Sequence, residues 1–222
     1  EDFTSAWKVR KYISDRSFYK RIIDVYEENS DRPFFCYGIS MRNHATYLSG
    51  YEGEVQLMGK YRGKYPDVDE YLSLLKLTDK DTKALIEYFS AVPDDTMIVF
   101  FGDHQPMIDK DFYSKLLGQD FSSVTVPENS KLYKIPYFVW TNYDADIEVP
   151  EEASINYLPN IILNAAGVAK NDWFNFTDEM FADYPIVTEN FIEVNEKLVE
   201  MDQVHERLDE VKSDSYGHPY YR

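Results

Sequence analysis

Three short apolar runs constrain the fold of this chain more than any other feature. They lie at residues 34–40 (FFCYGIS), 97–101 (MIVFF) and 134–142 (KIPYFVWTN). Each run is nearly continuous and does not alternate with polar residues, which is typical of strands that are covered on both faces. Helical patterns at residues 14–29 and 71–92 precede the first two runs. This order predicts an α/β layered sandwich with a mainly parallel sheet flanked by helices.

The expected helices have recognisable ends. Ser14 suits the N-cap of the first helix, which should end near Asn29. The second helix is expected to break near Thr78. A third helix is predicted at residues 153–168, with Gly167 at its C-terminal end.

The C-terminal segment has a different pattern. From Thr188 onward, apolar residues recur every three or four positions among many charges, which predicts an amphipathic helix. The chain is therefore divided into a main domain, residues 1–186, and a terminal helix with its tail, residues 187–222.

Charge and composition exclude several partners. The formal net charge is -17, whereas binding to a nucleic-acid backbone needs clustered Lys and Arg, so nucleic acid is excluded as a partner. No run of about 18 or more apolar residues occurs, so we expect the chain itself to be soluble. The single cysteine, Cys36, cannot form an internal disulfide and is expected to be buried in its apolar run.

An acid and an imidazole follow the second apolar run. Gly102 allows the backbone to turn, and Asp103 and His104 come directly after it. A carboxylate oxygen and an imidazole nitrogen suit a divalent cation, although catalytic metal centres usually need three or more protein ligands. Taken alone, the dipeptide is explained better by a simple turn in which Asp103 acts as a cap and His104 bonds to a backbone carbonyl.

A second candidate histidine follows the first run. In open α/β sheets, ligands collect at the carboxyl ends of the strands. His44 and the Asp103–His104 pair are both expected at that end, although an ordinary surface-loop histidine is an equally good interpretation of His44. His205 and His218 lie in the charged C-terminal segment and are expected to be solvated.

Longer segments of the sequence resemble a known family. The string TMIVFFGDHQP resembles the metal-binding segment of the sulfatase branch of the alkaline phosphatase superfamily, most closely the lipoteichoic acid synthase-like proteins. These are membrane-anchored extracellular enzymes of bacteria. The segments PFFCYGISMRNHATY, YLSLLKLTDKDTKALIEYF, KIPYFVWTNYD and SINYLPNIILNAAGV are similar to that family's in order and spacing. The resemblance covers about residues 12 to 170.

The resemblance implies a metal-dependent phosphotransferase or sulfatase that acts on phosphate or sulfate esters, including lipid-linked ones. Asp103 and His104 would be ligands of manganese, with calcium, magnesium or zinc as alternatives, and His44 would bind the phosphoryl or sulfuryl group. In this family an acidic metal ligand and a Thr or Ser nucleophile precede the segment that begins here near residue 13. The resemblance therefore implies that no catalytic nucleophile lies in this chain.

Two interpretations remain open. In the first, residues 1–186 are the C-terminal part of a sulfatase-like catalytic domain, incomplete and inactive in isolation. Its parent enzyme would lie on the extracellular face of a bacterial cell membrane, held there by N-terminal segments missing from this chain, and exposed sheet edges would favour self-association. In the second, the chain is a non-catalytic module that binds an anionic glycolipid or a cell-wall polymer. Within the first, the motifs favour a phosphate ester over a sulfate ester.

Overall fold

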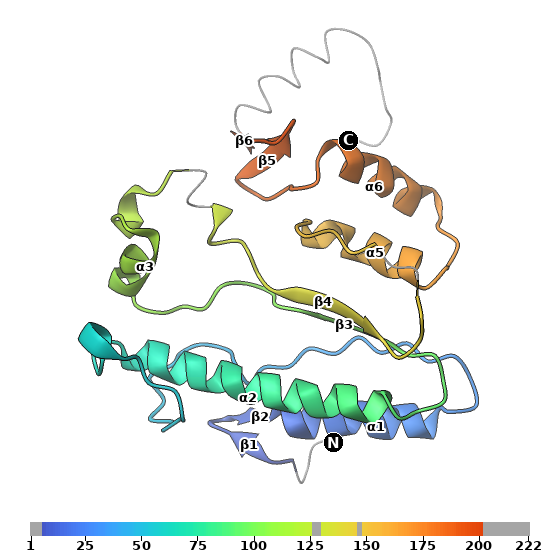
Figure 1. The fold of residues 1–222 in the computed structure, drawn as a ribbon, viewed down its shortest axis with the longest axis horizontal. Coiled ribbons are helices and arrows are strands. Elements are labelled where there is room, and N and C mark those ends of the chain that lie inside the picture. The colour runs from blue at the N-terminus through green and yellow to red at the C-terminus, as the bar shows by residue number, and fades with distance from the viewer. Residues whose placement is uncertain (1–5, 126–129, 146–147, 202–222) are drawn as a thin grey trace, which may run out of the picture. The chain divides into compact units, whose positions relative to one another are not determined.

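The computed structural model describes residues 6–125, 130–145 and 148–201, which form two compact units (Figure 1). Unit 1 comprises Glu1–Thr96 and Asp103–Ser123, and unit 2 comprises Met97–Gly102 and Val124–Arg222. The elements of unit 1 are β1 (Lys8–Val9), β2 (Tyr12–Ile13), α1 (Asp15–Glu28), η1 (Gly59–Tyr61), α2 (Pro66–Phe89), α3 (Lys110–Leu117) and η2 (Phe121–Ser123). Those of unit 2 are β3 (Met97–Phe101), β4 (Tyr137–Thr141), η3 (Ile155–Tyr157), α5 (Leu158–Ala165), α6 (Asp172–Asp183), β5 (Phe191–Val194) and β6 (Lys197–Glu200).

Two helices lie side by side in unit 1 (Figure 1). The start of α1 is confirmed, because the Ser14 side chain accepts a hydrogen bond from the Ser17 amide at 3.1 Å, and Asn29 caps its end. Helix α2 begins with Pro66, whose missing N–H costs nothing in the first turn. The predicted break near Thr78 is wrong, since α2 continues through that residue without interruption.

Two tyrosines of α1, the buried Tyr19 and the half-buried Tyr26, join these two helices. The Tyr19 hydroxyl of α1 lies 3.1 Å from Thr82 Oγ1 of α2, and the Tyr26 ring meets the Phe89 ring edge-on at 5.2 Å. Burial raises the pKa of Tyr19 to about 12, although its hydrogen bond with Thr82 opposes the shift. Tyr19 is therefore expected to stay protonated in the folded protein at pH values where an unfolded chain would ionise it.

This shift predicts a loss of stability in alkali. Because the pKa of Tyr19 is higher in the folded than in the unfolded state, its stabilising contribution is complete below pH 10 and is lost as the pH rises toward 12. Two pKa units correspond to about 2.7 kcal/mol at most. In urea unfolding at several pH values, the stability of the wild type relative to Tyr19→Phe should fall by up to that amount. A difference that stays constant between pH 8 and pH 12 would contradict the prediction.

The N-terminal hairpin closes a small core in unit 1. Strands β1 and β2 pair antiparallel, with Val9 opposite Tyr12. Val9, Tyr47 and Leu74 are buried against one another, and Ile108 packs on this cluster. The cluster therefore joins the hairpin, the loop that carries His44, helix α2 and the segment that follows His104.

Two of the three predicted strands form a ladder in unit 2. β3 and β4 pair antiparallel, with Met97 opposite Thr141 and Phe101 opposite Tyr137, and the rings of Phe100 and Phe138 stack at 5.3 Å. Every strand pair in the described parts of the chain is antiparallel, so these residues do not form the expected parallel sheet. The connection from β3 to β4 begins and ends at the same end of the ladder, which makes the direction antiparallel.

The remaining predicted strand, at residues 34–40, is not formed. A strand needs hydrogen bonds to a neighbour, and this segment joins no ladder in the described residues. Phe34 is half-buried beside the Tyr26 ring of α1, whereas residues 35–40 are all exposed, with Phe35 and Tyr37 at 84% and 66%. The expected burial of Cys36 is wrong for the same reason, since its thiol is exposed.

The expected C-terminal helix is replaced by a hairpin over its described part. β5 and β6 pair antiparallel through a two-residue turn in which Asn195 and Glu196 have φ angles of 51° and 61°. Two such residues form the tight turn that matches the twist of a hairpin. Phe191 and Ile192 are buried in β5, and their spacing from the later apolar residues also fits a helix, which explains the error. Residues 202–222, which include His205 and His218, lie outside the described residues, and the predicted boundary at residues 186 and 187 stays a prediction.

The third predicted helix is confirmed. Residues 155–157 form a single turn that leads into α5, and Gly167 follows the helix with a φ angle of 63°. Tyr157, Leu158 and Ile161 are buried there. Among the described residues, no helix is both long and apolar enough to cross a membrane.

Candidate metal and phosphate site

The Asp103 and His104 side chains converge after β3. His104 Nε2 lies 3.4 Å from Asp103 Oδ2, and the His104 amide donates a hydrogen bond to Asp103 Oδ1 at 2.9 Å. His104 Nδ1 lies 2.8 Å from the Gln105 carbonyl oxygen, so this nitrogen carries the proton and donates it. Nε2 is then the nitrogen with a free lone pair, and it lies close to the Asp103 carboxylate.

This donor set suits part of a cation site. One carboxylate oxygen and one imidazole nitrogen, on side chains that are both more than half exposed, can bind manganese or zinc. Within the residues that the structure describes, no group of three or more His, Cys, Asp or Glu side chains could hold a metal ion. Asp103 and His104 thus fit a metal ion as two of its ligands and do not complete a centre.

The segment after His104 is fixed to unit 1. Ile108 packs against the core of that unit, and the Asp109 amide donates to Asp67 Oδ2 at 2.6 Å. The Tyr113 hydroxyl donates to the Pro106 carbonyl at 2.6 Å. These contacts hold the loop that presents Asp103 and His104.

His44 lies in a loop of the same unit and is exposed. Its Nδ1 lies 2.8 Å from the Ala45 carbonyl oxygen and 3.4 Å from the Tyr12 hydroxyl. Nδ1 is therefore engaged by the protein, whereas no hydrogen bond to Nε2 occurs within the described part of the chain. In the imidazolium form, Nε2 is a hydrogen-bond donor for an anionic oxygen.

A buried arginine, Arg42, holds the loop that carries His44. Arg42 is fully buried, and its guanidinium lies 2.7 Å from Asp15 Oδ2 and 2.6 Å from Asp81 Oδ2. The Thr78 hydroxyl accepts hydrogen bonds from Arg42 at 2.6 Å and from Asn43 at 2.7 Å. The partners of Arg42 and Asn43 lie on or next to α1 and α2, far away in the chain, so no local sequence pattern indicates this role.

A second arginine holds the loop by its backbone. Arg10, in the turn between β1 and β2, forms a buried ion pair with Glu70 at 3.1 Å. Its guanidinium also donates to the carbonyl oxygens of Arg42 at 3.2 Å, His44 at 3.0 Å and Thr46. The role of Arg10 was not predicted, because no local sequence pattern around it indicates these contacts.

Tyr47 connects the two predicted parts of the site. Its hydroxyl donates to the Asn43 carbonyl at 2.8 Å, which closes the His44 loop. Burial raises the pKa of Tyr47 to about 12, and the Asp103 carboxylate is among the charges that add to this shift. Asp103, His104 and His44 all lie in unit 1, and Tyr47 of the His44 loop and Ile108 of the segment after His104 belong to the same core cluster.

Comparison with known proteins defines the class. The family model described as Sulfatase matches residues 1–168, which is most of the chain, and this protein belongs to the sulfatase family. The expected sulfatase-like α/β fold is confirmed.

Two relatives are informative about the fold. The structure of Streptococcus pyogenes phosphoglycerol transferase GacH in complex with sn-glycerol-1-phosphate is similar, with a TM-score of 0.64 and 20% identity. The match covers 96% of this chain and 51% of that one. A Rhizobium meliloti (strain 1021) protein, named for the modification of cyclic beta-1,2-glucan, is 23% identical over 195 residues, covering 84% of this chain and 30% of the relative. The chain thus spans about half the length of the first and less than a third of the second.

Proposed function

We propose that the chain is the metal- and phosphate-binding part of an enzyme that transfers a phosphate-ester group. The observation that carries the proposal is the convergence of Asp103 Oδ2 and His104 Nε2, 3.4 Å apart, in the unit that also contains His44. Membership of the sulfatase family supports ester chemistry. The glycerol phosphate named with the solved relative favours phosphate over sulfate.

Each residue has a distinct role in this proposal. Asp103 and His104 supply two ligands to a divalent cation, with manganese as first choice, and the bound cation would supply positive charge to the phosphoryl oxygens. His44 donates from Nε2 to a phosphoryl oxygen while Nδ1 is held by the Ala45 carbonyl. The nucleophile and the remaining ligands belong to other parts of the parent protein, so the isolated chain would be inactive.

The same proposal extends to the setting of the enzyme. A lipid-linked donor at the extracellular face of a bacterial membrane would agree with the resemblance to lipoteichoic acid synthase-like proteins. Self-association of the isolated chain through its strand edges stays a prediction that size-exclusion chromatography with light scattering can test.

Two histidine variants of the parent protein test the site. We expect His104→Ala to lower both bound manganese and turnover of bis-p-nitrophenyl phosphate by about tenfold to 100-fold, because it removes a metal ligand. His44→Ala should lower turnover by a similar factor and leave the metal content unchanged. Metal content is measured by plasma mass spectrometry, and p-nitrophenyl sulfate serves as the competing ester.

Three results would overturn parts of the proposal. Unchanged turnover in both variants would remove the site assignment, and faster turnover of the sulfate would reverse the choice of ester. A parent protein that turns over neither ester, yet binds a cell-envelope glycolipid equally well after Asp103→Ala, would favour the non-catalytic binding module.

A further inference from the structure

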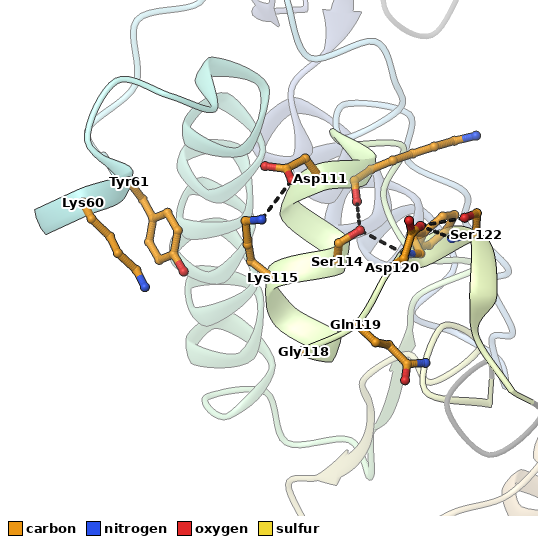
Figure 2. Close-up of a pocket in the computed structure, with 11 residues that line it drawn as sticks. Lys60, Tyr61, Asp111, Ser114, Lys115, Gly118, Gln119, Asp120 and Ser122 are labelled. Carbon is orange, nitrogen blue, oxygen red and sulfur yellow. Dashed lines mark hydrogen bonds and ion pairs between the residues drawn. The ribbon is translucent and has the colours of Figure 1, made fainter.

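We infer that a pocket over η1, α3 and η2 binds a phosphorylated sugar. The pocket has a volume of about 860 Å³, within the usual range for small-ligand sites. The binding does not depend on the proposed function. Figure 2 shows Lys60 and Tyr61 at one side, Asp120 and Ser122 at the other, and residues of α3 between them.

The pocket lies in the same unit as the candidate metal ligands. All of its lining residues fall within unit 1, and α3 begins at Lys110, shortly after His104 in the chain. The contacts of Pro106 and Asp109 described above fix the connecting loop. A ligand in this pocket is therefore held by the structural unit that presents Asp103 and His104.

Two lysines of the pocket pair with aromatic rings. Lys60 Nζ lies 5.0 Å from the centre of the Tyr61 ring, and Lys110 Nζ lies 6.0 Å from the centre of the Phe121 ring. No ion pair joins either lysine to a carboxylate in the described parts of the chain. Each lysine thus keeps an ammonium group for an anionic ligand, in a protein whose net charge is -17.

The two aspartates of the pocket are already engaged by the protein. Asp111 accepts from the Tyr65 hydroxyl and pairs with Lys115 at 3.1 Å, which lowers its pKa. Asp120 accepts from the Ser122 amide at 2.8 Å and from its hydroxyl at 2.6 Å. The pocket is lined by three lysines, Lys60, Lys110 and Lys115, and by only these two aspartates, so its charged side chains have a net positive charge.

The combination of rings and ammonium groups selects the ligand class. A sugar ring has apolar C–H faces that can pack on an aromatic side chain, and its hydroxyl groups match serine hydroxyls and amide groups. A phosphate on that sugar would pair with a lysine ammonium group. An inorganic anion would use the lysines alone, and a neutral sugar would use the rings alone.

The test is a calorimetric titration of this chain in a chelator, so that the candidate metal site takes no part. We expect glucose 6-phosphate to bind at least fivefold more tightly than either glucose or inorganic phosphate. The double variant Lys60→Gln/Lys110→Gln should weaken glucose 6-phosphate at least tenfold, and Tyr61→Leu at least threefold. Lys83→Gln is the matched control, because Lys83 is an exposed lysine of α2 outside the pocket.

The outcomes separate this inference from the proposed function. No saturable binding, or equal weakening by Lys83→Gln, would overturn the pocket whatever the parent enzyme does. Equal affinity for inorganic phosphate, together with an unaffected Tyr61→Leu variant, would reject the sugar. Thermal unfolding of each variant verifies folding, and a conservative Tyr61→Phe variant should retain binding if Tyr61→Leu proves unstable. Binding as expected in a parent without phosphotransferase activity would keep the site and reject the reaction.

Discussion

Replacing Arg42 with methionine is expected to lower the free energy of unfolding by roughly 3 to 5 kcal/mol, the usual cost of removing one partner from a buried ion pair. Methionine keeps much of the side-chain volume and removes the charge. Asp15 and Asp81 would then face each other in the interior, where they are 1% and 8% exposed. Burial already raises the pKa of Asp15, and the Arg42 guanidinium opposes that shift, so its loss leaves the carboxylate without compensation.

Urea unfolding measures this effect through the midpoint at an unchanged slope. The triple variant Arg42→Met/Asp15→Asn/Asp81→Asn should recover much of the lost stability, because no uncompensated buried charge remains. Arg21→Met is the matched control: Arg21 pairs with Glu28 at 2.9 Å on the surface of α1, so its change should cost less than about 1 kcal/mol. A loss below 1 kcal/mol for Arg42→Met would show that the buried cluster contributes little.

Replacing Arg10 with glycine is expected to cost about 2 to 4 kcal/mol, since it leaves Glu70 buried and three loop carbonyls without their donor. The range is lower than for Arg42 because Glu70 also accepts from the amide and hydroxyl of Ser49, at 3.0 Å and 2.6 Å. Glycine is the sharpest choice, because Arg10 has a φ angle of 59° that glycine adopts without strain. Relief of backbone strain at this φ angle opposes the greater freedom of glycine in the unfolded chain, so the lost side-chain contacts are expected to dominate the change.

The same variant should loosen the loop that carries His44. Hydrogen exchange of residues 41–49 is expected to quicken more than that of α6, which belongs to the other unit. Arg10→Lys should rescue little, because an ammonium group cannot span Glu70 and several carbonyls as a guanidinium does. Unchanged exchange in the loop, together with lost stability, would show that Arg10 supports the fold without positioning His44.

Local signals predicted much of the helical structure. Ser14 and Asn29 bound α1, and Gly167 ends the segment of α5, as expected from their side-chain hydrogen bonds and backbone freedom. The helix was expected because Phe191, Val194 and Leu198 recur at helical spacing, and it did not form. The two residues at positive φ, Asn195 and Glu196, decided for a hairpin.

Strand formation was harder to predict than the apolar runs themselves. The apolar runs at Met97–Phe101 and Tyr137–Thr141 pair with each other. Residues 34–40 are a similarly apolar run, but they join no strand ladder among the described residues. A strand depends on a partner that the run cannot specify alone. The antiparallel direction likewise follows from the pairing of Phe101 with Tyr137.

The amino-acid order by itself determined that Asp103 and His104 stand together after an apolar run, because adjacency in the chain guarantees adjacency in space. Tertiary structure alone decided what holds the rest of the site. Arg42 reaches Asp15 and Asp81, and Arg10 reaches Glu70, across separations for which no local pattern exists. Such buried pairs form only when several elements pack and exclude water, so their roles emerge from the fold and not from any short stretch of sequence.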